Sequence, residues 1–173
     1  MAEIRCVVFD VDGVLTDGRL YYAGRAEPMR AFDVHDGFAI HWLERLGVTP
    51  VILTGKSSEG VSARAEELDI RHVIQGSRDK LTDLKKLLVE LDFTLDEVAM
   101  IADDLPDLPV LRNCAWPIAV ANAVEEVKAV ARYTTEKTGG RGAVRQALEH
   151  LLRADGRWAR VIDHYEQQAG RTA

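Results

Sequence analysis

The chain has 173 residues, a length that favours one domain with a buried core. Its 28 acidic residues outnumber its 22 lysines and arginines, and a net charge of -6 without a basic run argues against nucleic-acid ligands and anionic membrane surfaces. No segment approaches the ~20 apolar residues of a membrane span, and Asp10 ends the first apolar run, so we expect no signal peptide and a cytoplasmic protein.

Short apolar runs alternate with helical patterns along the chain. The apolar runs are predicted strands, and they lie at 4–9, 47–53, 72–74, 98–102 and 116–120. Apolar residues recur at helical spacing over 61–68 and 81–91. This alternation predicts an α/β fold with a doubly wound, Rossmann-like parallel sheet.

Two further segments complete the predicted organisation of a single domain over 1–173. Residues 18–34 contain two β-prone pieces around Gly24, which predicts a β-hairpin inserted directly after the first strand. Loops at the carboxyl ends of parallel strands face the ligand, so we expect this hairpin beside the active site. The tail 139–173 is predicted to be helical from Ala143, with a break near Asp155.

The first predicted strand ends in two carboxylates, Asp10 and Asp12. Burying an unpaired carboxylate is costly, so each needs hydrogen-bond donors or a cation, and a hard ion such as Mg²⁺ meets that need. The alternative is a purely structural turn, because Asp12-Gly13 is a common turn pair.

Polar groups also follow the next predicted strands. Thr54 and Gly55 follow the second, where a hydroxyl and a backbone N–H can contact an oxyanion, although a simple loop is the alternative. Lys80 follows the third strand and, taken alone, is typical of a surface charge. Three carboxylates follow the fourth strand, those of Asp103, Asp104 and Asp107. They repel one another unless they share a cation, and the alternative is a polar loop.

The carboxyl ends of parallel strands meet at one rim of the sheet, so these groups together indicate one site rather than four coincidences. Two other phosphate-handling classes fit less well. A phosphoryl-receiver domain carries its acceptor aspartate after the third strand, where this chain has Gln75-Gly76. The P-loop pattern GxxxxGK[ST] is missing from the sequence.

In order along the chain, Asp10-x-Asp12, Thr54, Lys80 and Asp103-Asp104 resemble the four motifs of the haloacid dehalogenase superfamily of phosphatases. The closer resemblance is to the 3-deoxy-D-manno-octulosonate 8-phosphate phosphatase family. It covers nearly the whole chain and rests on segments 10–18 (DVDGVLTDG), 32–37, 53–55, 75–76, 79–80, 103–107 and 139–145.

The resemblance implies a Mg²⁺-dependent phosphomonoesterase that works through an aspartyl-phosphate intermediate. Asp10 is the implied nucleophile, and Asp12 the general acid and then the general base. The implied Mg²⁺ ligands are Asp10, the backbone carbonyl of Asp12, and Asp103, with Asp104 and Asp107 supporting them from behind.

The remaining implied contacts are with the substrate. Thr54, the N–H of Gly55 and Lys80 are expected to bind the phosphoryl oxygens. The expected substrate is the phosphate of a 2-keto-3-deoxy sugar acid. The eight-carbon 3-deoxy-D-manno-octulosonate 8-phosphate, used in lipopolysaccharide biosynthesis, is the first choice, and a nine-carbon sialic-acid-type 9-phosphate is the alternative.

Three residues are expected to contact the sugar, and two of them, Lys56 and Glu67, to distinguish the two substrates. Lys56 stands where the octulosonate phosphatases typically have Arg. Relatives that act on the nine-carbon substrate carry Glu there and Lys at the position of Glu67, the reverse of the charges in this chain. Arg64, common to both groups, would contact the sugar carboxylate.

The resemblance also implies a homotetramer without a cap domain. About forty residues separate Asp12 from Thr54, too few for a folded lid. The hairpins of four copies would pair into a central barrel, and a neighbour's glycine-rich tail would cover the site. The implied interface residues are Tyr21, Tyr22, Met29 and Phe32. A non-catalytic oligomerisation module is the second functional hypothesis, although every catalytic carboxylate is present.

Overall fold

A computed structural model describes residues 3–169. Its centre is a six-stranded parallel sheet with the order β3-β2-β1-β4-β5-β6. The strands are β1 (Cys6–Phe9), β2 (Thr49–Leu53), β3 (His72–Ile74), β4 (Val98–Ala102), β5 (Trp116–Ala119) and β6 (Tyr133–Thr134). The sequence predicts the first five to within two residues at each end. It does not predict β6, because two residues are too short to show a period.

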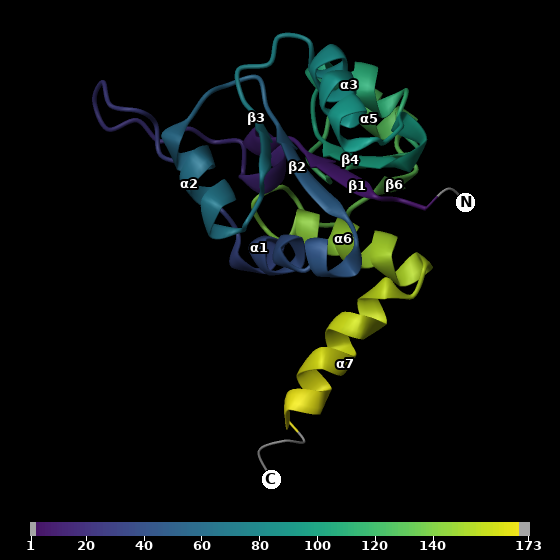
Figure 1. Ribbon diagram of the computed structural model, residues 1–173. Helices are drawn as coiled ribbons and strands as arrows, with labels where there is room; N and C mark the ends of the chain where they lie inside the picture. The colour runs from purple at the N-terminus through teal and green to yellow at the C-terminus, as the bar shows by residue number, and fades with distance from the viewer. Residues whose placement is uncertain (1–2, 170–173) are drawn as a thin grey trace.

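Helices cover both faces of this sheet, which explains why β1 and β4 are apolar and buried along their whole length. The helices are α1 (Val34–His41), α2 (Glu59–Glu67), α3 (Lys80–Leu91), α4 (Leu108–Leu111), α5 (Glu125–Val130), α6 (Ala143–Ala154) and α7 (Arg157–Ala169). In Figure 1, α1 and α6 lie below the sheet, and α3 and α5 lie above it.

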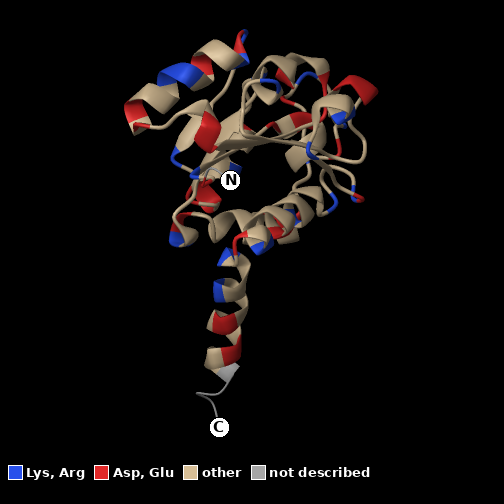
Figure 2. Cartoon of the chain, turned by 90° about the vertical axis from the view of Figure 1, so that its right-hand side faces the viewer, with Lys and Arg blue, Asp and Glu red and all other residues tan. Residues whose placement is uncertain are grey.

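The end of helix α7 projects from the body of the domain in Figures 1 and 2, whereas its middle packs near α1, where the ring centroids of His164 and Tyr165 lie 4.9 and 5.9 Å from that of Trp42. It follows the predicted break, where Gly156 adopts a φ of 79°. In its first turns, the side chains of Trp158 and Val161 are buried, whereas those of Ile162 and Tyr165 are exposed. The end of the predicted tail, residues 170–173, lies outside the described residues. Over residues 3–169, no helix combines the length and apolar character that crossing a bilayer requires.

The inserted segment 18–34 is a long loop closed by one antiparallel pair rather than a full hairpin. The backbone N–H of Tyr21 donates to the carbonyl of Met29 at 3.2 Å, and the N–H of Met29 donates back at 3.0 Å. The loop projects beside α2 in Figure 1. A two-stranded ribbon without further partners is only marginally stable, which explains why the pairing stops after one bridge.

The glycine-rich turn before α6 packs against the loop that follows β1 in the same chain. The N–H of Gly140 donates to the carbonyl of Val14 at 3.0 Å. Asn122 joins the same two segments, since its side chain donates to the Gly13 carbonyl at 2.9 Å and accepts from the Gly139 N–H at 2.7 Å. Gly139 and Gly140 therefore support the loop after β1 of their own chain, and coverage of a neighbour's site by the glycine-rich tail stays a prediction.

Replacement of Gly139 by alanine tests this close approach. A Cβ at position 139 would lie 1.9 Å from the Gly13 carbonyl oxygen, so the backbone must move. We expect Gly139→Ala to lower the free energy of unfolding by about 1–3 kcal/mol, measured by urea denaturation. The control is Gly60→Ala within α2, where the nearest atom is 3.6 Å away and helix propensity favours alanine. Equal midpoints for Gly139→Ala and the unsubstituted chain would contradict this account.

Candidate active site

The predicted site residues meet at the carboxyl edge of the sheet. Asp10, Thr54 and Asp103 directly follow β1, β2 and β4, which are neighbours in the sheet. The chain leaves β1 toward β2 and later returns to its other side with β4, which creates the crevice where α/β folds bind ligands. A cleft of about 190 Å³ opens there, lined by Asp10, Asp12, Thr54, Gly55, Lys56, Lys80, Asp103, Asp104, Pro106 and Asp107.

A tight turn over Val11–Leu15 carries the first two carboxylates into the cleft. The hydroxyl of Thr16 holds this turn, accepting from the Gly13 N–H and donating to the Val11 carbonyl, both at 3.3 Å. Gly13 has a φ of 94°, and a Cβ there would lie 2.0 Å from the Asp103 carboxylate. Glycine is therefore required twice at this position, for its backbone angle and for the approach of Asp103.

Thr54 and Gly55 lie where the sequence predicts, at the end of β2. The backbone N–H of Thr54 donates to the Ile74 carbonyl at 2.9 Å, and its carbonyl accepts from Ser77 at 3.1 Å. The side chain of Thr54 is buried, although it reaches the cleft wall. This anchoring leaves the Thr54 hydroxyl and the Gly55 backbone as fixed donors beside Asp10.

Lys80 is a buried ammonium between two carboxylates. Asp79 caps α3 by accepting from the Thr82 N–H at 3.1 Å, and so sets the start of the helix that carries Lys80. The Lys80 Nζ donates to Asp10 at 2.9 Å and to Asp107 at 2.6 Å. Burial acts to lower the pKa of Lys80, but the charges of these two carboxylates outweigh it and raise the pKa. Lys80 therefore stays charged in the cleft.

The donor set fits a hard divalent cation. One carboxylate oxygen from each of Asp10, Asp103 and Asp107 lies within 4.8 Å of the others. One buried oxygen of Asp103 and one of Asp107 have no hydrogen-bond partner in the described part of the chain. Burial, and then the charges of Asp10 and Asp104, raise the pKa of Asp103 to about 7. Carboxylate oxygens that lack donors and repel one another are the ligands that Mg²⁺ takes.

Asp104 and Asp107 differ in a way that the sequence does not reveal. Asp104 is exposed, and its side chain accepts from the Leu105 N–H at 2.8 Å, which caps the following turn. Asp107 is buried and faces the cluster through Lys80. Burial and the charge of Asp10 raise the pKa of Asp107. Asp107 therefore belongs to the charged centre, and Asp104 lies at its rim.

Asp12 is held by two cations on the outer side of the cleft. Arg30, from the inserted loop, donates through Nε to one carboxylate oxygen of Asp12 at 2.8 Å. The Nζ of Lys56 lies 3.4 Å from the other oxygen. Burial would raise the pKa of Asp12, but the hydrogen bond and charge of Arg30, with Lys56, lower it. Arg30 is not predictable from the sequence alone, because a single arginine in an inserted loop carries no motif.

Arg64 and Glu67 do not line the cleft. Arg64 donates to Glu67 at 2.8 Å and to the backbone carbonyl of Asp33 at 3.1 Å, and its guanidinium lies over the ring of Phe32. Gly37 of α1 faces this guanidinium so closely that a Cβ would lie 2.2 Å from it. Arg64 therefore ties α2 to α1, and its proposed contact with the sugar carboxylate stays a prediction.

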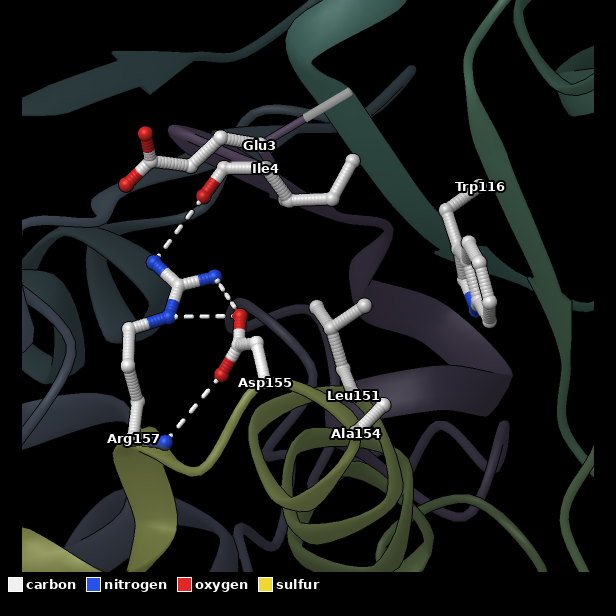
Figure 3. A pocket seen from close by; sticks show the side chains of 7 residues that line it. All are labelled: Glu3, Ile4, Trp116, Leu151, Ala154, Asp155 and Arg157. Atoms are coloured by element: carbon white, nitrogen blue, oxygen red, sulfur yellow. Dashed lines mark hydrogen bonds and ion pairs between the residues drawn. The ribbon is translucent and has the colours of Figure 1, made fainter. Parts of the chain in front are cut away.

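A larger cavity, of about 360 Å³, lies near the amino ends of β1 and β5 (Figure 3). It is lined by Glu3, Ile4, Trp116, Leu151, Ala154, Asp155 and Arg157. The guanidinium of Arg157 in this cavity already makes contacts within the protein. It donates to the Ile4 carbonyl at 3.0 Å and to Asp155 at 2.7 Å. The catalytic, metal-binding and phosphate-binding residues that the sequence predicts line the smaller acidic cleft and not this cavity.

Comparison with known proteins agrees with this geometry. The sequence profile of the haloacid dehalogenase-like hydrolases matches residues 70–148. The 3-deoxy-D-manno-octulosonate 8-phosphate phosphatase of Yersinia pestis is 39% identical over 153 residues, which are 88% of this chain and 82% of the relative.

Solved structures are similar over almost the whole chain. A probable YrbI-family phosphatase from Pseudomonas syringae is 44% identical, with a TM-score of 0.91, and the match covers 94% of this chain and 92% of that one. The 3-deoxy-D-manno-octulosonate 8-phosphate phosphatase of Moraxella catarrhalis, in complex with a magnesium ion, a phosphate ion and a KDO molecule, is 42% identical. Its TM-score is 0.90, with 94% of this chain and 93% of that one covered.

The sheet order, the four polar strand ends and these relatives lead to one conclusion. This chain is a phosphoric monoester hydrolase, and it belongs to the 3-deoxy-D-manno-octulosonate 8-phosphate phosphatase family of haloacid dehalogenase-like hydrolases.

Proposed function

We propose that this protein hydrolyses 3-deoxy-D-manno-octulosonate 8-phosphate through an aspartyl-phosphate formed on Asp10, with Mg²⁺ as its cofactor. The observation that carries the proposal is the buried charge cluster. Asp10 lies 2.9 Å from the Lys80 ammonium and shares the cluster with Asp103 and Asp107, whose buried oxygens lack donors in the described residues. The substrate follows from the relatives, one of which was crystallised with KDO and phosphate.

The two carboxylates of the first motif divide the chemistry. A carboxylate oxygen of Asp10 forms a bond to phosphorus, and the bond from phosphorus to the sugar oxygen breaks. Arg30 and Lys56 hold the pKa of free Asp12 below its usual value, so Asp12 first takes up a proton from the bound phosphate monoanion and then gives it to the departing sugar oxygen. Asp12 then takes a proton from a water molecule, which attacks phosphorus and releases phosphate as the bond to Asp10 breaks.

The surrounding residues lower the cost of bringing one anion to another. Lys80, the Thr54 hydroxyl and the Gly55 N–H bind the phosphoryl oxygens, and Asp107 orients Lys80 at 2.6 Å. A bound Mg²⁺, held by Asp10, the Asp12 carbonyl and Asp103, supplies the positive charge that an anionic nucleophile needs against a phosphate. Asp104 supports this arrangement from the rim.

Lys56 is the cleft residue that we propose for reading the sugar acid. Its side chain is 59% exposed and lies beside Asp12, on the side away from the buried cluster. An ammonium in that position attracts a carboxylate on the leaving sugar. Because lysine contacts a carboxylate as a point charge, this contact is less selective in geometry than an arginine would be.

A substrate panel tests the activity and the sugar together. We expect Mg²⁺-dependent phosphate release with the highest kcat/KM for the eight-carbon substrate, compared with the nine-carbon 9-phosphate, glucose 6-phosphate and p-nitrophenyl phosphate. Asp10→Asn should abolish turnover of all four, whereas Asp96→Asn, at an exposed site away from the cleft, should not. Preference for the nine-carbon substrate would replace the first choice, and no turnover at all would leave the non-catalytic oligomerisation module.

The acidic cluster also predicts how pH and metal change stability. The pKa of Asp103 rises from 3.8 to about 7 on folding, so the folded chain binds more protons than the unfolded chain between these values. Stability of the metal-free protein should therefore fall as pH rises through this range, and Asp36, whose pKa burial raises to about 6, acts in the same direction.

Added Mg²⁺ should offset this loss. We expect MgCl₂ to raise Tm more at about pH 7.5 than at about pH 5.5, because protonated carboxylates do not bind the ion. At ~100 times its Kd the ion stabilises the folded chain by about 2.7 kcal/mol. Calorimetry of EDTA-treated protein with and without MgCl₂ measures the shift. An equal shift at both pH values, or an undiminished shift in Asp103→Asn, would contradict the proposed site.

We also propose that the inserted loop joins copies of the chain into a homotetramer. It exposes Tyr21, Tyr22 and Met29 by 45%, 68% and 63%, which is costly for a free loop in water. Light scattering of the unsubstituted chain should give the mass of four copies, and Tyr22→Glu should lower it by placing a charge in the contact. A monomeric mass for the unsubstituted chain at micromolar concentration would rule out this assembly.

A further inference from the structure

Arg30 is a buried arginine at the base of an exposed loop. Its side chain is 5% exposed, although it belongs to the inserted segment that projects beside α2. Its Nε donates to one oxygen of Asp12 at 2.8 Å, and its Nη2 donates to the other at 3.4 Å. A guanidinium that reaches both oxygens of one carboxylate fixes the plane of that carboxylate as well as its position.

The guanidinium is itself held from two further sides. Its Nη1 donates to the hydroxyl of Ser58, the N-cap of α2, at 3.1 Å. The same Nη1 lies 3.9 Å from Glu27, whose carboxylate also accepts from the Glu59 N–H at 3.3 Å. Arg30 thus joins the inserted loop, the start of α2 and the loop after β1, and none of these can move without disturbing the others.

Lys56 cannot replace this contact. It is the other cation on Asp12 in the described part of the chain, at 3.4 Å, and its side chain is 59% exposed. An exposed lysine pair contributes little and constrains only a distance, since an ammonium has no plane. The orientation of the Asp12 carboxylate therefore depends on Arg30.

The two oxygens of Asp12 have different surroundings. Oδ1 accepts the short bond from Arg30 Nε, whereas Oδ2 has only contacts of 3.4 Å, with Arg30 Nη2 and Lys56 Nζ. Oδ1 is thus the anchored oxygen, and Oδ2 is the one free to exchange a proton with a group in the cleft.

We propose that Arg30 is a positioning residue for the reaction, which holds the Asp12 carboxylate so that Oδ2 faces the departing sugar oxygen and then the attacking water. The inference rests on the proposed function, because it assigns the proton transfers to Asp12. The side-chain partners of Arg30 are Asp12, Ser58 and Glu27, and Arg30 does not line the cleft, so it acts through Asp12.

Leaving-group dependence tests this role. The octulosonate 8-phosphate releases a basic alkoxide that needs a proton, whereas p-nitrophenyl phosphate releases a stable phenolate that does not. We expect Arg30→Met to lower kcat/KM for the sugar phosphate by roughly 10- to 100-fold, at or below the ~10²–10⁴-fold that general acid catalysis supplies. The value for p-nitrophenyl phosphate should stay within about threefold, because that first step needs no acid.

Controls separate positioning from folding. Arg25→Met changes an exposed arginine of the same loop, away from the cleft, and should alter neither value. Arg30→Lys keeps the charge without the planar contact and should fall between Arg30→Met and the unsubstituted chain. Guanidinium ion added to Arg30→Ala should partly restore turnover of the sugar phosphate alone. Inhibition by inorganic phosphate should be unchanged in every variant.

Several outcomes would overturn the inference. A loss by the same factor for both substrates would mean that Arg30 only maintains the fold. A rise in KM for the sugar phosphate at constant kcat would mean that Arg30 binds the sugar. If Asp12→Asn itself shows no selective loss for the sugar phosphate, Asp12 is not the acid and the role of Arg30 falls with it. Inactivity of the unsubstituted chain toward all phosphates would instead refute the proposed function.

Discussion

The structure depends on the burial of charge at the carboxyl edge of the sheet. Asp10, Asp103 and Asp107 place three carboxylates in one small volume, and Lys80 is the single buried cation among them. Charges removed from water are tolerated only when paired, so this cluster has a deficit of positive charge. The same deficit that raises the pKa of Asp103 makes the cleft a site for a divalent cation and a phosphate. The repulsion among these carboxylates therefore destabilises the metal-free fold, while the same repulsion favours the binding of a cation.

The rest of the fold meets this demand through backbone contacts. Gly13 permits the approach of Asp103, and Gly139 permits the approach of the segment before α6 to the Gly13 carbonyl. Asn122 bridges the two. The loop after β1 is thus supported by residues more than a hundred positions away in the sequence. Rigid support of this kind keeps catalytic groups in place without a cap domain.

The site divides into an inner and an outer half. The inner half contains Asp10, Lys80 and Asp103, which follow strands of the sheet and which we propose contact the phosphate and the cation. The outer half contains Asp12 and Arg30, to which we assign the proton transfers, and the inserted loop supplies Arg30. The inserted loop that exposes Tyr21 and Tyr22 also carries Arg30, so our proposals for assembly and for proton transfer concern the same segment.

The sequence by itself determined the sheet and the edge at which the polar strand ends meet. Strands covered on both faces are continuous apolar runs, and the ends of parallel strands must meet at one edge, so Asp10, Thr54, Lys80 and Asp103 could be brought together without coordinates. Only the tertiary structure decided which charges pair. Arg30 lies 18 residues from Asp12, and Lys80 lies 27 residues from Asp107. The contact of Arg64 with the Asp33 carbonyl at the start of α1 could not be predicted from the sequence either. Such pairs depend on the path of the loops and on how closely neighbouring atoms approach the glycines. Neither leaves a periodic signal in the sequence.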